Sequence, residues 1–300
     1  MLVTTKNLLS KALKGHYAVG QFNVYNLESA EAVIRAAEAE KSPVILGITE
    51  KTIVYIGLHE LSVAIKERVK KSKVPIVLHL DHAKNIDLIK ECIKEGFTSV
   101  MFDGSFYPLE VNIKLTQKVA KIAHQKKVSV EGEVGRLGIL NKKACSFTDP
   151  KEAYKFVQRT NVDALAIAVG TSHGAYKFVG KPFLDIARIK LIKEKINIPL
   201  VLHGASAVLP HLVKKANQYG ASLKKTSGLS NLLIKKAIKA GICKINIDTD
   251  LRLAFIASLR GGLAKNKKGL DPREFLKDAY QEVEKLVREK IKLFGSRNKI

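Results

Sequence analysis

The chain has 300 residues and 46% of them are hydrophobic, which suits one large α/β domain or two smaller ones. Lys and Arg total 52 against 28 Asp and Glu, a formal net charge of +24, but the basic residues are spread along helical faces. Without zinc-finger spacing or an aromatic RNA-binding motif, this charge does not indicate a nucleic-acid-binding protein.

Three features of the chain bear on its place in the cell. No apolar run reaches about 18 residues, so we expect no membrane-spanning helix. The N-terminal stretch lacks the long apolar core and cleavage site of a signal peptide. The cysteines Cys92, Cys145 and Cys243 form no CxxC pair, which is typical of reduced thiols. We therefore expect a cytoplasmic protein.

Short apolar segments with strand character alternate with helical patterns along the whole chain. The eight segments are residues 18–24, 43–49, 75–81, 99–104, 128–134, 164–170, 199–205 and 244–249. Between them, apolar residues recur every three or four positions, as in 27–41 and 111–127. This alternation predicts βαβ units, and eight units in about 250 residues predict one (β/α)8 TIM barrel covering residues 1–300.

An open, doubly wound sheet is the alternative fold. That fold usually carries a glycine-rich fingerprint after its first strand. Here the first strand leads into "NVYNLES", which has no such fingerprint, so the barrel is favoured.

Polar residues gather where the predicted strands end. They are Asn23, Thr49, Asp81, His82, Asp103, Glu131, Glu133, His173, His203, Asn246 and Asp248. In a barrel these ends open on one rim, where the active sites of TIM-barrel enzymes lie. The pattern therefore predicts an active site rich in His and carboxylate groups.

Three of these residues are histidines at or just beyond a strand end: His82, His173 and His203. A single histidine is more often a core or loop residue, but three imidazoles and an open position are typical of catalytic zinc. Asp81 precedes His82 directly, so both can reach the rim only if the strand becomes irregular there. A carboxylate so placed suits acid–base catalysis. His79 shares a strand face with Asp81, and we expect it to lie under the site.

The stretches "VLHLDH", "MFDGS", "VEGEVGRLG", "VGTSHGAYK", "PLVLHGAS", "KINIDTDLRLAF", "DPREF" and "LFGSRNKI" resemble class II, zinc-dependent fructose-bisphosphate aldolases. The resemblance covers nearly the whole chain, extends to tagatose-bisphosphate aldolases, and is strongest to the class IIB subgroup. It implies reversible cleavage of fructose 1,6-bisphosphate into dihydroxyacetone phosphate and glyceraldehyde 3-phosphate through a zinc-stabilised enediolate. Two alternatives stay open: another ketose bisphosphate such as tagatose 1,6-bisphosphate, and a low-activity basic barrel with a binding role.

The resemblance also implies a role for individual residues. His82, His173 and His203 would hold catalytic Zn²⁺, Asp81 would move the proton of the C4 hydroxyl, and Asp103 and Glu133 match a second metal position. The substrate-binding residues would be Asn23, Thr49, Gly174, Lys177, Gly204, Ala205, Ser206, Asn246, Ile247, Asp248, Thr249, Arg252 and Arg273. The last would come from a neighbouring subunit of a homodimer or homotetramer, and a monovalent cation, Na⁺ or K⁺, is expected near the substrate.

The chain departs from the family pattern in two places. After "GRLG" the family has a mobile loop whose glutamate handles the proton at C3, whereas this chain reads "ILNKKACSFTDP". Either another base such as Glu131 acts, or proton exchange is slow, or efficient activity is lost, or the loop was trimmed without loss of function. After the second strand, "TEKT" stands in place of a serine and flexible glycines, which predicts altered affinity or specificity.

Overall fold

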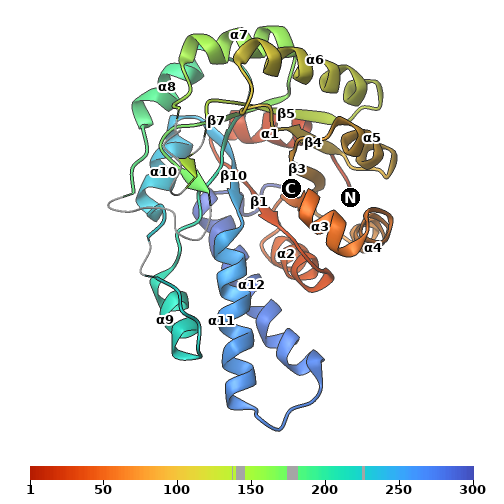
Figure 1. The fold of residues 1–300 in the computed structure, drawn as a ribbon, viewed down its shortest axis with the longest axis vertical. Coiled ribbons are helices and arrows are strands. Elements are labelled where there is room, and N and C mark those ends of the chain that lie inside the picture. Colours follow the sequence, from red (N-terminus) through yellow and green to blue (C-terminus); the bar gives the residue numbers. More distant parts are fainter. Residues whose placement is uncertain (137, 140–145, 174–181, 225–226) are drawn as a thin grey trace.

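Eight parallel strands close into a barrel in the computed structural model, which describes residues 1–136, 138–139, 146–173, 182–224 and 227–300 (Figure 1). The barrel strands are β1 (Val19–Asn23), β2 (Val44–Thr49), β3 (Ile76–Ala83), β4 (Ser99–Phe102), β5 (Ser129–Val134), β7 (Ala164–Ile167), β9 (Leu200–Leu202) and β10 (Ile242–Ile247). Their order around the barrel is β1-β10-β9-β7-β5-β4-β3-β2. The predicted TIM barrel is confirmed, with each predicted strand in place.

Helices surround the barrel and connect its strands. They are α1 (Thr5–Gly15), α2 (Leu27–Ala39), α3 (Glu50–Ile56), α4 (Leu58–Lys70), α5 (Ile86–Lys94), α6 (Leu109–Gln125), α7 (Pro150–Thr160), α8 (Ile186–Lys195), α9 (Pro210–Gln218), α10 (Asn231–Ala240), α11 (Thr249–Lys265) and α12 (Pro272–Phe294). Two short strands, β6 (Gly138–Ile139) and β8 (Ser172–His173), pair in parallel outside the barrel. No helix in the described ranges combines the length and apolarity needed to cross a membrane.

The interior of the barrel is apolar at one end and polar at the other. At the N-terminal ends of the strands, Val19, Ile45 and Val77 pack with Leu9 of α1 in one buried cluster. Helix α1 therefore closes this end of the barrel. The outward-facing strand residues form a second cluster with the surrounding helices. Because both faces of each strand are covered, the strands are apolar until they approach the rim.

Helices α11 and α12 form a long antiparallel arm that extends away from the barrel, with α9 alongside (Figure 1). A buried ion pair joins its two helices, because Lys290 Nζ lies 2.8 Å from Asp250 Oδ2. The same carboxylate accepts the backbone N–H groups of Ala207 and Val208 at 2.8 and 2.7 Å. Asp250 thereby fastens the loop after β9 to the arm.

The Lys290→Met variant tests this anchor. It leaves the Asp250 carboxylate buried without its cation, and we expect the free energy of unfolding to fall by about 3 kcal/mol. This value is the lower end of the range for breaking a buried pair, because two backbone N–H groups still bind the carboxylate. Urea denaturation followed by circular dichroism measures the change.

The matched control is Lys215→Met, which removes a partly exposed lysine 3.6 Å from Glu282. Its expected cost is at most about 1 kcal/mol. Equal losses in the two variants would contradict the role given to Lys290.

Candidate active site

The end of β3 departs from regular strand geometry at His82. This residue has φ of +51°, and the register with β4 shifts between Leu80 and Ala83. A left-handed backbone is uncommon for a residue other than glycine and costs on the order of 1–3 kcal/mol. The irregularity lets the adjacent side chains of Asp81 and His82 both serve the rim, as expected from the sequence.

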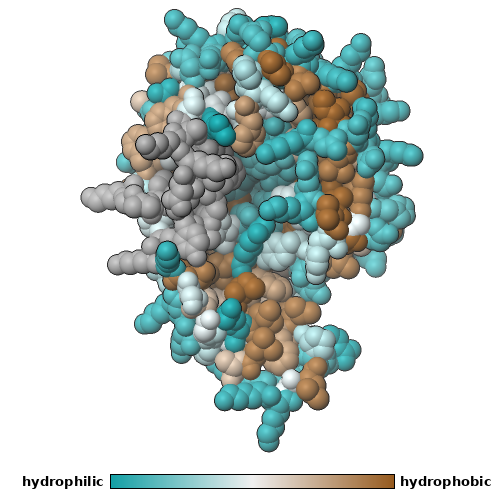
Figure 2. Space-filling view, viewed as in Figure 1, coloured by the Kyte–Doolittle hydropathy of each residue, from teal (hydrophilic) through white to brown (hydrophobic). Residues whose placement is uncertain are grey.

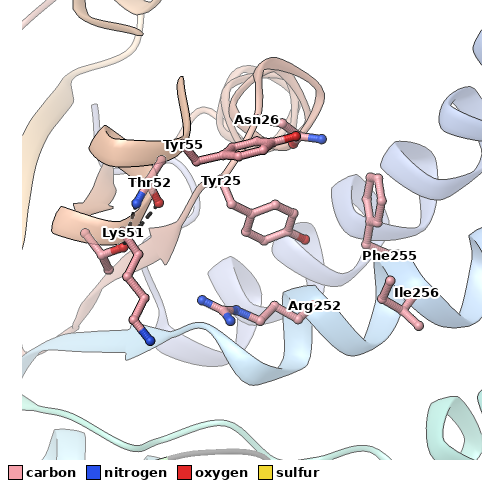
Figure 3. Close-up of a pocket in the computed structure, with 9 residues that line it drawn as sticks. Tyr25, Asn26, Lys51, Thr52, Tyr55, Arg252, Phe255 and Ile256 are labelled. Carbon is pink, nitrogen blue, oxygen red and sulfur yellow. Dashed lines mark hydrogen bonds between the residues drawn. The ribbon is translucent and has the colours of Figure 1, made fainter. Parts of the chain in front are cut away.

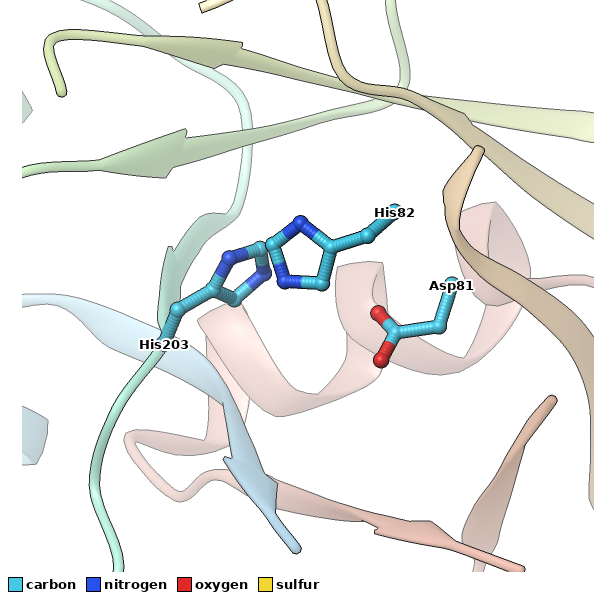
Figure 4. A group of neighbouring side chains, drawn as sticks. All are labelled: Asp81, His82 and His203. Atoms are coloured by element: carbon cyan, nitrogen blue, oxygen red, sulfur yellow. The ribbon is translucent and has the colours of Figure 1, made fainter. Parts of the chain in front are cut away.

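Two imidazoles and three carboxylates meet at this rim. The rings of His82 and His203 lie 4.5 Å apart between centroids, at 65° to each other, and Asp81 lies beside them (Figure 4). Among the described residues, two overlapping groups bring their ligand atoms within 4.8 Å of one another: Asp81, His82 and His203, and His82, Asp103 and Glu133. Imidazole nitrogen and carboxylate oxygen are typical ligands of zinc and related divalent metals. The donor set therefore fits a metal ion.

Acidic groups surround both imidazoles. His82 Nδ1 lies 3.1 Å from Asp103 Oδ2. The other oxygen of this carboxylate, Oδ1, accepts a hydrogen bond from Ser105 Oγ at 2.7 Å. His203 Nδ1 lies 3.3 Å from Glu133 Oε2. Burial alone would lower the pKa of His203, but its bonds to Glu131 and Glu133 outweigh burial and raise that pKa to about 10. The pocket thus favours a cation at this position.

Asp81 is held as a carboxylate. Asn23 Nδ2 donates to Asp81 Oδ2 at 2.8 Å, and Asn246 Nδ2 donates to Oδ1 at 3.3 Å. Burial would raise the pKa of Asp81, but the charges of His82 and Lys244 hold it well below its usual range. Asp81 is therefore an ionised carboxylate held at the rim by two amide donors.

A buried charge pair supports the site from inside the barrel. Lys244 Nζ lies 2.7 Å from Glu131 Oε2, with side chains 0% and 1% exposed. The other oxygen, Glu131 Oε1, is 3.0 Å from His203 Nε2. When Glu131 accepts the Nε2 proton, it orients the ring and turns Nδ1 toward Glu133, as partners of metal-binding histidines do.

Lys244 was not among the predicted site residues. A signal was present, because a lysine two positions before Asn246 in an otherwise apolar strand shares its inward face. Glu131, in turn, was considered as a substitute base for the missing loop glutamate. The structure argues against that role, because both of its carboxylate oxygens are bound beneath the rim.

His79 lies below the site, where the sequence placed it. Its Nδ1 is 2.8 Å from Ser99 Oγ, and Ser99 Oγ is 2.9 Å from Thr5 Oγ1 of the closing helix. Its Nε2 faces Asp81 and Glu131 at 4.0 and 3.9 Å. Burial and the charge of Lys244 lower the pKa of His79 to about 3, so the ring is neutral.

The predicted phosphate loop follows β9. Gly204 has φ of +66°, and a Cβ there would lie 2.6 Å from the Ser172 carbonyl oxygen, so a side chain does not fit. Ala205 and Ser206 are buried, and Ser206 Oγ has no hydrogen-bond partner in the described ranges. Ile247 is buried in the core between strands and helices, so only its backbone can reach a ligand.

Four other predicted residues lie farther out. Thr49 Oγ1 accepts the N–H of Thr52 at 3.3 Å and caps α3, while Thr249 begins α11. Arg252 Nε lies 2.7 Å from Asp248 Oδ1. Arg273 lies in the first turn of α12 at the tip of the arm, with its side chain 88% exposed and paired with Asp271. The structure does not bring Arg273 to the rim of its own chain.

Some predicted features fall outside the described residues. They are Gly174, Lys177 and the central part of the altered loop, residues 140–145. For His173 the structure describes the backbone, paired in β8 with Ile139, and not the side chain.

Comparisons with known proteins all indicate one enzyme family. A family model described as "Fructose-bisphosphate aldolase class-II" matches residues 3–299. The fructose-bisphosphate aldolase of Thermus caldophilus is 45% identical over 304 residues, with 99% of each chain covered. That of Helicobacter pylori strain ATCC 700392 / 26695 is 42% identical over 307 residues, with 100% of each covered.

Solved structures of aldolases share the fold. The YdjI aldolase from Escherichia coli K12 superimposes with a TM-score of 0.82 at 31% identity, covering 100% of this chain and 99% of that one. The fructose-bisphosphate aldolase of Campylobacter jejuni gives a TM-score of 0.82 at 23% identity, with 100% and 97% covered, and so supports the fold alone.

The Glu131→Gln variant tests the support of His203. Glutamine keeps the size but loses the charge that holds the ring, and we expect metal affinity to fall about 10- to 100-fold. Competition with a chromophoric chelator measures this affinity.

The matched control is Glu152→Gln, an exposed residue of helix α7. Glu131→Gln leaves the buried ammonium group of Lys244 without its counter-charge, so it should also lower the free energy of unfolding. The Glu131→Gln/Lys244→Met double variant removes both buried charges, so its free energy of unfolding should recover while its metal affinity stays low. Unchanged affinity in both Glu131 variants would show that this carboxylate does not position a ligand.

Proposed function

Because the chain belongs to the class II fructose-bisphosphate aldolase family, we propose that it cleaves fructose 1,6-bisphosphate reversibly into dihydroxyacetone phosphate and glyceraldehyde 3-phosphate. The convergence of Asp81, His82 and His203 at the barrel rim carries this proposal (Figure 4). A metal position beside an ionised carboxylate is the arrangement that metal-assisted carbon–carbon cleavage requires.

The enzyme is metal-dependent, and we propose Zn²⁺ as the metal. His82, His173 and His203 would hold it, with Asp103 and Glu133 as a second position. The described side chains of this set, those of His82, His203, Asp103 and Glu133, fall within the two groups of converging ligand atoms. When bound, such an ion polarises the ketone oxygen as a Lewis acid and so stabilises the charge left on the adjacent carbon. The buried, carboxylate-lined imidazoles support this assignment, because they already stabilise positive charge.

Asp81 performs the proton transfer at C4. During cleavage it takes the proton of the C4 hydroxyl, and during condensation it returns that proton. Asn23 and Asn246 each donate a hydrogen bond to one of its oxygens, which holds the carboxylate in one orientation at the rim. Because the metal would stabilise the charge left next to the ketone, the reaction needs no Schiff base between a lysine and the substrate.

The loops after β9 and β10 bind the dihydroxyacetone phosphate half, with a monovalent cation, Na⁺ or K⁺, nearby. TIM barrels often bind phosphate at this part of the rim. On these two loops the residues would be Gly204, Ala205, Ser206, Asn246, Ile247, Asp248 and Thr249. Gly174 and Lys177, which lie between β8 and α8 in the sequence, would complete the set. Ser206 supports this role most directly, because its buried hydroxyl has no protein partner in the described part of the chain.

We also propose that the protein is a homodimer or homotetramer. Arg273 lies at the tip of the arm, from which it can reach the site of a neighbouring subunit. Apolar side chains are exposed along the arm, where Ile256 and Leu263 of α11 are 42% and 49% exposed. Figure 2 shows brown patches, the colour of hydrophobic residues, on the surface of this part of the molecule.

The Asp81→Ala variant tests the proton transfer. We expect the turnover number to fall by ~10² to 10⁴ while metal stays bound, because the histidine ligands remain. A coupled assay of fructose 1,6-bisphosphate cleavage gives the rate, and elemental analysis gives the metal content. Near-normal turnover in this variant would rule out Asp81 as the catalytic acid–base.

Metal removal tests the reaction class. We expect EDTA to abolish cleavage of fructose 1,6-bisphosphate and added Zn²⁺ to restore it. Tagatose 1,6-bisphosphate in a parallel assay determines which C4 epimer is preferred. Cleavage that EDTA leaves unchanged would contradict the metal mechanism, and no cleavage of either sugar by zinc-loaded protein would favour a binding role.

A further inference from the structure

Two sides of the barrel rim differ in what they hold. On one side, residues that follow β10, β1 and β2 line a pocket of about 470 Å³, among them Tyr25 and Thr49 (Figure 3). Strands β3, β4 and β5 come next around the barrel, and their ends carry one group of converging ligand atoms, those of His82, Asp103 and Glu133. Whatever fixes the loops after these three strands therefore also bears on metal binding.

The ring of Phe106, in the loop after β4, joins the loops on either side of it. Lys84 Nζ lies 3.9 Å from the centre of this ring, and the guanidinium carbon of Arg136 lies 4.9 Å from it. Both distances are within the range of cation–π attraction. Neither cation has an ion pair with a carboxylate in the described part of the chain, so the ring is the partner of both charges.

Each of the two cations follows a candidate ligand closely in the chain. Lys84 comes two residues after His82, and Arg136 comes three residues after Glu133. The backbone of Arg136 is itself held, because it exchanges two N–H···O bonds with Ser146, at 2.8 and 3.0 Å. This bridge closes the base of the loop that departs from the family pattern. With such short connections, a displacement of either cation also displaces its ligand.

Phe106 is coupled to the third ligand, Asp103, through a tight turn. The N–H of Tyr107 donates to the carbonyl oxygen of Gly104 at 3.0 Å, and Ser105 and Phe106 lie at the centre of this turn. Ser105 gives both its backbone N–H and its hydroxyl to Asp103 Oδ1, at 3.2 and 2.7 Å. The turn that presents the ring therefore also orients the carboxylate.

We propose that Phe106 is a positioning residue for the metal. By binding Lys84 and Arg136 together, its ring clamps the three loops that carry the ligands and so fixes the distances between them. Phe106 is 42% exposed, so burial in the core does not account for its place on the rim. The inference rests on the proposed metal site, and groups that hold the ligands of a metal commonly affect its affinity.

The Phe106→Leu variant tests the clamp, because leucine keeps an apolar side chain and removes the ring. We expect the affinity for Zn²⁺ to fall roughly tenfold, the factor that corresponds to two cation–π contacts at a partly exposed position. Phe106→Tyr keeps the ring and should stay within about twofold of the unmodified protein. Competition with a chromophoric chelator measures the affinity, and circular dichroism shows that each variant is folded.

A double-mutant cycle tests whether the ring acts through the cations. Lys84→Gln removes one contact and should lower the affinity for Zn²⁺ about threefold, whereas Lys84→Arg should leave it near its original value. The Lys84→Gln/Phe106→Leu double variant should bind Zn²⁺ no more weakly than Phe106→Leu alone, because the contact is already lost. Lys84→Gln also tests the clamp independently of how Phe106→Leu folds.

Two controls match these changes at places away from the clamp. Tyr154→Leu removes an exposed aromatic ring from α7, and Lys94→Gln removes an exposed charge from the last turn of α5. Both variants should bind Zn²⁺ as the unmodified protein does.

The outcomes separate this inference from the function on which it rests, since binding of Zn²⁺ is measured without substrate. An unmodified protein that binds no Zn²⁺ overturns the metal assignment and the clamp with it. If Zn²⁺ does bind, unchanged affinity in Phe106→Leu overturns the clamp alone. Equal losses in Phe106→Leu and Phe106→Tyr, or losses that add in the double variant, also overturn it, because the ring would then not act through its cations.

Discussion

The buried pair of Lys244 and Glu131 is the interaction on which the site depends. Two opposite charges inside a barrel are tolerated only when each is paired and hydrogen-bonded. Here the pair contributes to the charge state of its neighbours. Glu131 provides the acceptor for His203, and Lys244 adds to burial in keeping His79 neutral and to His82 in keeping Asp81 ionised. The chemistry at the rim is therefore arranged one layer below it.

This arrangement explains why the barrel is divided into an apolar and a polar half. Helix α1 and the lower strand residues form a dry cluster that excludes water from one end. Above it, hydrogen bonds run from Thr5 through Ser99 to Nδ1 of His79, so this side of the ring is satisfied by the protein itself, whereas its Nε2 has no hydrogen-bond partner among the described residues. Stability comes mainly from the lower half and the surrounding helices, while the upper half holds groups that a stable core would avoid.

Much of the fold could be predicted from the sequence, because every strand is short, apolar and followed by a helical repeat. The irregular end of β3 could also be anticipated, since adjacent Asp81 and His82 cannot share one face of a regular strand. The pairing of Lys244 with Glu131 could not, because the residues are 113 positions apart and meet only through the closure of the barrel. Similarly, nothing local indicates that Asp250 would bind Lys290 and the loop after β9.

The left-handed backbone at His82 limits what evolution or design can place there. Histidine, asparagine and aspartate tolerate this conformation better than other non-glycine residues, and all three offer nitrogen or oxygen to a metal. β-Branched residues are strained at such a position. Cysteine, the ligand of softer metals, does not share the tolerance of histidine, asparagine and aspartate for this backbone conformation. The shape of one peptide unit thus narrows the metals that this barrel can be redesigned to hold.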